Sequence, residues 1–183
     1  MSVPTVGQPP VVRAVDVLAD KDMRDLLVNG FPARLHFGAE LWSVSGWFND
    51  LERAVEWDIV VQFDAFTKSY RVLRILGDQI TALGTFADLD GVSAALASPF
   101  RPPLVPPSRR GGRFYYSASL DLETLSMSDL DELERWLRGE LRPAVRGQRN
   151  PGTALTRGLR TLFVRLLGGE KRHYEAQSGT FRT

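Results

Sequence analysis

Two stretches of alternating apolar and polar side chains constrain the fold of this chain more than any other feature. They span residues 33–42 and 55–63. Their apolar positions are Leu35, Phe37, Ala39 and Leu41, then Val55, Trp57, Ile59, Val61 and Phe63. A period of two places successive side chains on opposite faces of a β-strand. We therefore predict two half-buried strands whose apolar faces share one core.

Other segments extend this pattern. Strand character is also found in residues 11–18, 70–75, 80–83 and 114–122. Residues 64–68 predict the turn of a hairpin, and residues 20–25 indicate a charged turn or a short helix. Helical spacing occurs in residues 86–98, and leucine stripes predict two more helices beyond residue 126.

The order of these elements indicates the α+β class: an antiparallel β-sheet or β-sandwich with helices toward the C-terminus. A parallel α/β sheet is not expected, because helices do not alternate with strands. We predict a flexible leader (residues 1–10), a β-rich domain (11–125) and a helical extension (126–183) packed on or beside it. Within the β-rich domain, the paired prolines of residues 99–112 predict an exposed, stiff connector.

The residue types restrict the chemistry. The chain has no cysteine, which excludes disulfides, thiolate nucleophiles and cysteine metal sites. It also lacks a Gly-x-Ser-x-Gly elbow, a phosphate-binding Gly-Lys-Ser/Thr loop and a His-Glu-x-x-His pair. The two histidines, His36 and His173, have no obvious nucleophile or converging ligands beside them. We expect no catalytic residue, metal or cofactor, although carboxylates such as Asp58 and Asp64 leave a small hydrolase-like enzyme open as an alternative.

Aromatic residues are concentrated between the two alternating strands, at Trp42, Trp47, Phe48 and Trp57. Trp47 and Phe48 fall in the predicted link between the strands. One interpretation is that these rings cover the open end of the core. The other is that Trp47 and Phe48 form an exposed aromatic tip that binds a partner or a membrane interface.

Charge is unevenly distributed along the chain. Residues 1–100 carry a net charge of −5, whereas residues 141–183 carry +7, nearly all of it from arginine. We predict that Arg157, Arg160 and Arg165 lie beside the leucine stripe of the last helix. They are either solvated arginines of a packed helix or a docking surface for an acidic protein or an anionic membrane. Nucleic acid is the less expected partner, because few aromatic residues lie among the arginines.

The predicted start of this helix is a candidate anion site. Asn150 is the expected N-cap, and Pro151 the first helical residue. Free backbone amides at a helix N-terminus bind anions. The candidate anion-binding residues are Arg146, Arg149, Asn150 and Gly152.

Several motifs resemble an uncharacterised bacterial family, domain of unknown function 4390. They are Leu27–Phe37, Glu40–Trp42, Trp47–Phe48, Phe63–Val72 and the Phe-led helix at Phe86–Leu96. The resemblance covers about residues 10–125. It implies a bacterial protein of the cell envelope and carries no known activity. Family members usually have an export signal, which residues 1–10 do not resemble, and no run of about 18 apolar residues predicts a transmembrane helix.

Together these features predict a non-catalytic binding or scaffolding protein. It would contact a protein partner through the aromatic tip and the basic C-terminal helix. The alternatives are a small carboxylate-dependent hydrolase-like enzyme and a peripheral membrane protein docked by its C-terminal amphipathic helix.

Overall fold

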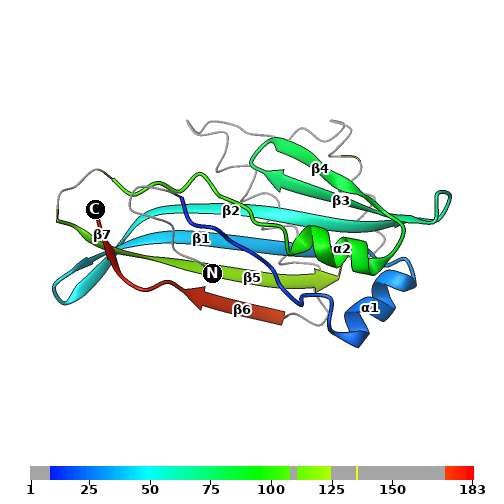
Figure 1. The fold of residues 1–183 in the computed structure, drawn as a ribbon, viewed down its shortest axis with the longest axis horizontal. Helices are drawn as coiled ribbons and strands as arrows, with labels where there is room; N and C mark the ends of the chain where they lie inside the picture. Colours follow the sequence, from blue (N-terminus) through cyan, green and yellow to red (C-terminus); the bar gives the residue numbers. More distant parts are fainter. Residues whose placement is uncertain (1–8, 108–110, 125–134, 136–171) are drawn as a thin grey trace.

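The protein is built around one curled antiparallel sheet (Figure 1). The computed structural model describes residues 9–107, 111–124, 135 and 172–183. In these residues the helices are α1 (Lys21–Val28) and α2 (Leu89–Leu96). The strands are β1 (Ala33–Ser45), β2 (Phe48–Asp64), β3 (Ser69–Leu76), β4 (Gln79–Phe86), β5 (Arg113–Thr124), β6 (Arg172–Gln177) and β7 (Phe181–Arg182).

The strand order is β4-β3-β2-β1-β5-β6, with β7 also paired to β5, and every strand pairing is antiparallel. This confirms the predicted α+β class with an antiparallel sheet, and the strands of the described residues form one sheet and not two sheets of a sandwich. β1 lies at the centre between β2 and β5. The 17-residue β2 is the longest strand of the described residues, and its two ends extend into the two hairpin turns that flank it.

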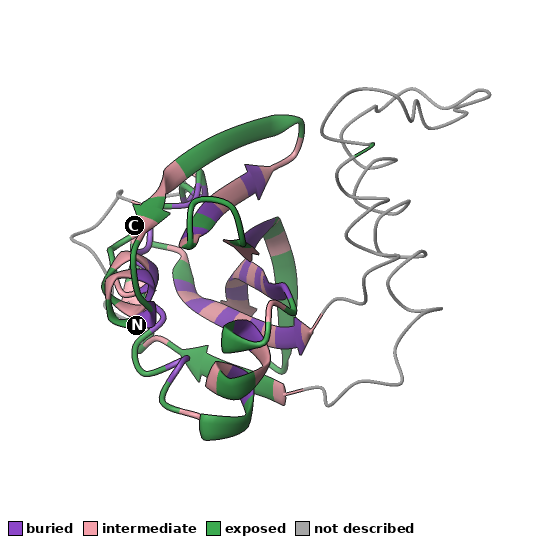
Figure 2. Cartoon of the chain, turned by 90° about the vertical axis from the view of Figure 1, so that its right-hand side faces the viewer, coloured by how far each residue is buried: buried purple, intermediate pink, exposed green. Residues whose placement is uncertain are grey.

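The core lies on one face of the sheet, here called the inner face. In the β1–β2 register, Leu35 pairs with Ile59 and Phe37 pairs with Trp57, and all four side chains are buried. The predicted shared core of these two strands is therefore confirmed. Helices α1 and α2 and the segments at 11–20 and 99–107 lie over this face (Figures 1 and 2). They contribute apolar side chains to the same cluster: Val12, Val17, Leu18, Met23, Leu27, Leu89, Val92, Leu96 and Leu104.

Both helices begin at an aspartate cap. Asp20 Oδ1 accepts a hydrogen bond from the Met23 amide at 2.9 Å, and Asp88 Oδ1 accepts one from the Gly91 amide at 2.8 Å. The predicted helix at 86–98 is therefore shorter at its start, because Phe86 still pairs with Tyr70 as the last residue of β4. α1 confirms the helix alternative for the charged segment at 20–25.

Two predicted segments differ from expectation. Residues 11–18 form a single bridge, from Val12 to Phe100, instead of a strand. Asp16 interrupts the extended backbone with a φ of +58°, which a continuing strand cannot contain. The proline-rich connector is also less exposed than predicted, because Pro102, Leu104 and Pro106 are buried while the residues between them are exposed.

The prediction of a helical C-terminal extension is wrong for residues 172–177 and 181–182, which form β6 and β7. The backbone of Arg172–Gln177 completes the open edge of β5, in a ladder from Leu122–Arg172 to Ser117–Gln177. Arg172 also forms an ion pair with Asp20, which ties β6 to the start of α1. The helices predicted between residues 126 and 171 lie outside the described residues, except Arg135, which is helical and exposed.

Candidate functional site

The β1–β2 hairpin ends in an exposed aromatic tip, defined here as Trp47 and Phe48. Ser45 pairs with Phe48, so Gly46 and Trp47 make a two-residue turn. Gly46 has a φ of +61°, and glycine at the first central position is typical of a type II′ hairpin turn. The turn directs Trp47 into solvent with 97% of its surface exposed, and Phe48 is 77% exposed.

The arm behind the tip has a distinct geometry. The β1–β2 register shifts between Leu41 and Trp42, so β2 carries one additional residue, Glu52, at this point. Such a bulge bends and twists a hairpin. Beyond it, residues 48–52 are almost all exposed, including Leu51 at 49%. The hairpin therefore projects past the core, as Figure 1 shows for the turn between β1 and β2.

Neighbouring side chains hold the base of this arm. The rings of Trp42 and Tyr115 are stacked, with centroids 6.4 Å apart and planes 6° apart. Trp42 Nε1 donates to Glu40 Oε2 at 2.8 Å, and Asn49 Nδ2 donates to Tyr115 Oη at 3.4 Å. These contacts connect β1, β2 and β5 directly behind the tip. The projecting backbone is thus supported from both neighbours of β1.

The aromatic residues found close together in the sequence therefore have different roles in the structure. Trp57 belongs to the core, where its ring stacks on Phe37 with centroids 5.0 Å apart. Trp42 supports the arm. The interpretation that Trp47 and Phe48 cover the open end of the core is wrong, because a covering ring must be buried and these two are exposed.

A polar cluster on the opposite, outer face of the sheet was missed by sequence reasoning. The register places Asp58, His36, Asp121 and His173 side by side on four adjacent strands. The buried Arg34 lies next to this row. Its Nη2 is 2.9 Å from Asp58 Oδ1, and its Nη1 is 3.5 Å from Glu123 Oε2. The alternation of side chains along each strand predicts that these residues lie on a polar face. Only the pairing of strands that are distant in the sequence brings them together.

Electrostatics within this cluster fix the charge of Asp58. Burial would raise the pKa of its carboxyl group, but the hydrogen bond from His36 and the guanidinium of Arg34 outweigh burial and lower the pKa. His36 Nδ1 lies 2.8 Å from Asp58 Oδ1. On the neighbouring strands, Glu175 and Asp121 raise the pKa of His173 through hydrogen bonds at 3.0 and 2.7 Å. Each carboxylate of the cluster thus lies beside a basic or histidine side chain.

The carboxylates considered for acid–base chemistry have other partners. Asp64 Oδ1 accepts hydrogen bonds from the amides of Phe66 and Thr67, at 2.9 and 3.3 Å, and so shapes the β2–β3 turn. These backbone hydrogen bonds also lower its pKa. Asp58 is bound to Arg34 and His36, so the two carboxylates serve separate structural contacts. Among the described residues, no group of three or more acidic or histidine side chains is placed to hold a metal ion.

The other predicted site residues lie outside the described part of the chain. They are Arg146, Arg149, Asn150, Gly152, Arg157, Arg160 and Arg165. The docking helix and the anion site therefore stay predictions. Within the described residues, no helix has the length and apolar character that crossing a membrane requires.

Sequence reasoning also missed Arg74, which lies on the inner face of β3, opposite Ile59 of β2. Its position has the same parity as Tyr70 and Val72, which are both buried. This alternation with two buried residues was the sequence signal that could have placed Arg74 on the inner face. The inner face could not be recognised from the sequence, because Leu73 and Ile75 make the other face of β3 apolar as well.

Comparison with known protein families, curated proteins and solved structures found no match to this chain.

Proposed function

We propose that this protein is a non-catalytic binding module that contacts a protein partner through the aromatic tip. The observation that carries the proposal is the exposure of Trp47 and Phe48 on a supported hairpin. Aromatic side chains bury 150–250 Å² each, roughly, and tryptophan is enriched among the residues that dominate binding energy. Two adjacent exposed rings on a projecting arm therefore suit insertion into a pocket of a partner.

The surroundings of the tip favour a protein over an anionic membrane. Residues 40–56 contain four acidic side chains and one basic side chain, Arg53. An anionic lipid surface would repel this arm, because its attraction depends on lysine and arginine near the headgroups. A protein pocket with neutral or basic edges would accept it. Leu51, beside the tip, adds a third exposed apolar side chain to the contact.

The arginine-rich segment supplies the second part of the proposal. Residues 141–183 carry a net charge of +7, so we expect them to bind an acidic surface. That surface belongs to the same partner or to another one. Arg157, Arg160 and Arg165 are the proposed contacts. The resemblance of residues 10–125 to domain of unknown function 4390 extends the proposal to a protein of the bacterial cell envelope.

The test uses crosslinking followed by a measured affinity. A photoreactive phenylalanine analogue placed at Trp47 is expected to capture a protein that the same analogue at Phe66 does not capture. Phe66 is the matched control, because it is 100% exposed on the β2–β3 turn at the other end of β2. The captured protein is then purified, and its binding to the wild-type chain is measured by calorimetry.

The affinity measurement decides the proposal. Trp47→Ser with Phe48→Ser is expected to abolish binding, whereas Phe66→Ser leaves the affinity unchanged. Binding that survives the double substitution, or that falls equally with Phe66→Ser, would show that the tip is not the contact surface.

A further inference from the structure

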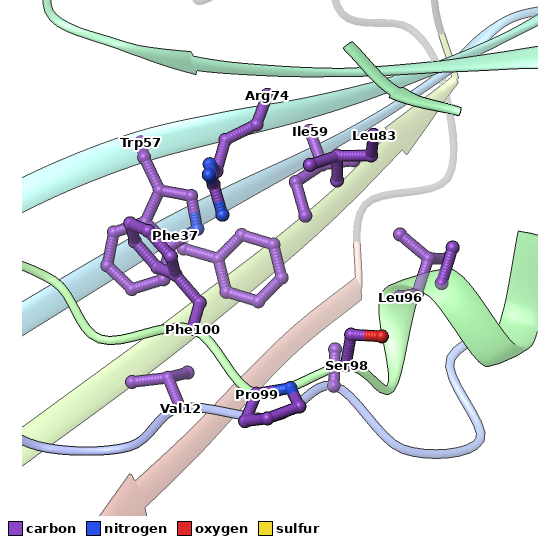
Figure 3. A pocket seen from close by; sticks show the side chains of 12 residues that line it. Val12, Phe37, Trp57, Ile59, Arg74, Leu83, Leu96, Ser98, Pro99 and Phe100 are labelled. Carbon is purple, nitrogen blue, oxygen red and sulfur yellow. The ribbon is translucent and has the colours of Figure 1, made fainter. Parts of the chain in front are cut away.

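A small apolar cavity on the inner face contains one cationic group. The cavity has a volume of about 130 Å³ and lies between the sheet, the end of α2 and the chain around Phe100. Aromatic and aliphatic side chains form most of its wall: Phe37, Trp57, Ile59, Leu83, Leu96 and Phe100. Arg74 of β3 is the charged residue among its lining residues (Figure 3).

The guanidinium of Arg74 is directed into this cavity. Its Cζ lies 4.2 Å from the centroid of the Phe100 ring. Figure 3 shows the nitrogen atoms of Arg74 pointing toward Trp57 and Phe37, while its stem runs back to the strand. An arginine that merely covers apolar surface extends its charged end into water. The charged end of Arg74 lies over the Phe100 ring instead.

Among the described residues, none supplies a negative charge to Arg74. Its register partners are Ile59 on β2 and Thr81 on β4. Within the described residues, no carboxylate or carbonyl oxygen forms an ion pair or hydrogen bond with its guanidinium. The contact with Phe100 compensates only part of the lost hydration of the cation. Burial accordingly lowers the pKa of Arg74.

Other arginines of the same sheet show the contrast. Arg71, three residues earlier on β3, is exposed and donates to Gln62 Oε1 at 2.8 Å. Arg34 is buried, but two carboxylates accompany it. Arg74 differs from both, because its partly buried guanidinium faces an apolar space. An anion that enters this space could therefore pair with the guanidinium.

From this geometry we infer that the cavity is a binding site for a small monocarboxylate with an apolar body about the size of one ring. A carboxylate matches the two parallel donors of a guanidinium. An apolar cavity of about 150 Å³ accepts benzene, so the present volume limits the apolar body to a similar size. The walls of Phe37, Trp57 and Phe100 fit a flat ring or a short branched chain. This site is separate from the aromatic tip.

The test measures the binding of phenylacetate and benzoate by calorimetry and by two-dimensional NMR. We expect saturable binding, with shifts confined to residues around Trp57, Leu83 and Phe100. Benzyl alcohol serves as the uncharged probe and should bind more weakly than either carboxylate. Absence of saturable binding by both carboxylates, or shifts located elsewhere, would overturn the inference.

Two arginine variants test the role of the charge. Arg74→Met keeps the apolar stem and should weaken carboxylate binding about tenfold or more, since hydrogen bonds to charged groups are among the strongest. It should leave the affinity for benzyl alcohol unchanged. Arg71→Met is the matched control on the same strand and should bind like the wild type. Equal carboxylate affinity in Arg74→Met and wild type, or equal losses in both variants, would refute the site.

Two further variants separate the donor geometry of Arg74 from the space in the cavity. Arg74→Lys retains the charge without the planar pair of donors, and its carboxylate affinity should fall between those of the wild type and Arg74→Met. Leu83→Phe should reduce binding of both the carboxylates and benzyl alcohol by filling the cavity. Circular dichroism of each variant establishes that the sheet is retained before affinities are compared.

Discussion

Substitution of Asp58 by asparagine tests the outer-face cluster most directly. Asp58 Oδ1 lies 3.0 Å from Arg34 Nε, 2.9 Å from Arg34 Nη2 and 2.8 Å from His36 Nδ1. The side chains of Asp58 and Arg34 are 12% and 7% exposed, so this is a buried ion pair. Asparagine preserves the shape of the side chain and removes its charge, which leaves Arg34 with Glu123 at 3.5 Å.

The expected loss of stability follows from this burial. Removing one partner of a buried ion pair costs about 3–5 kcal/mol, because the remaining charge is left without full compensation. Glu123 still faces Arg34, which places the expected loss near the lower end, at about 3 kcal/mol. In a chain of this size each kcal/mol lowers the melting temperature by about 2–4 °C, so the expected decrease is roughly 6–12 °C.

The effect should also depend on pH. Burial opposes ionisation of Asp58, but His36 and Arg34 lower its folded-state pKa below the ordinary value of 3.8. A lowered pKa contributes stability above the unfolded pKa, and this stability is lost as the pH falls through the folded value. The difference between wild type and Asp58→Asn should therefore be full at pH 7 and shrink below about pH 4.

The assay is urea unfolding of both proteins at pH 7, 5 and 3. Asp90→Asn is the control, because Asp90 pairs with Arg24 at 3.1 Å with both side chains exposed. Such surface pairs contribute about 1 kcal/mol or less. If Asp58→Asn loses no more stability than Asp90→Asn at pH 7, or if its loss persists unchanged at pH 3, the reasoning about the buried pair is refuted.

Three further predictions concern other parts of the molecule. Trp47→Ser with Phe48→Ser should change the free energy of unfolding by about 0.5 kcal/mol or less, whereas Trp57→Ala should cost about 3–5 kcal/mol, both measured in urea. Raising the pH above about 6.5, through the raised pKa of His173, should weaken the β5–β6 pairing and accelerate amide exchange of β6 after correction for intrinsic rates; pH-independent protection would contradict this. Glutamine at Arg157, Arg160 and Arg165 should weaken partner binding several-fold at 0.1 M salt and much less at 1 M, and equal affinity at low salt would contradict the docking role.

The central strands could be predicted from sequence because their pattern is local. One face of β1, β2 and β5 is apolar at almost every second residue, and a half-buried strand requires that alternation. Residues 11–18 showed the limit of this signal. They are apolar and β-branched, but Asp16 breaks the extended backbone, and their burial comes from packing over the sheet.

The candidate sites were predictable to different extents. Gly46 followed by Trp47 at the end of an alternating run suggested a turn with an aromatic residue, but its exposure depends on how far the hairpin projects past the core. The cluster around Asp58 and the cavity around Arg74 depend on the pairing of β1 with β5 and on the placement of Phe100. The alternation of apolar and polar residues within one strand does not predict those long-range contacts.

The attachment of β6 illustrates why the C-terminus was the hardest part to predict. Its partner β5 ends at Thr124, and 47 residues separate that position from Arg172. Closing a connection of this length costs about 2 kcal/mol more than closing a four-residue hairpin. The strand itself offers little apolar burial, since Arg172–Gln177 is almost entirely exposed. Its backbone ladder is therefore supplemented by polar pairs at both faces, Arg172 with Asp20 and His173 with Asp121. Because these pairs depend on charge, deprotonation of His173 should destabilise this edge of the sheet more than the central strands. The central strands are stabilised by buried apolar side chains.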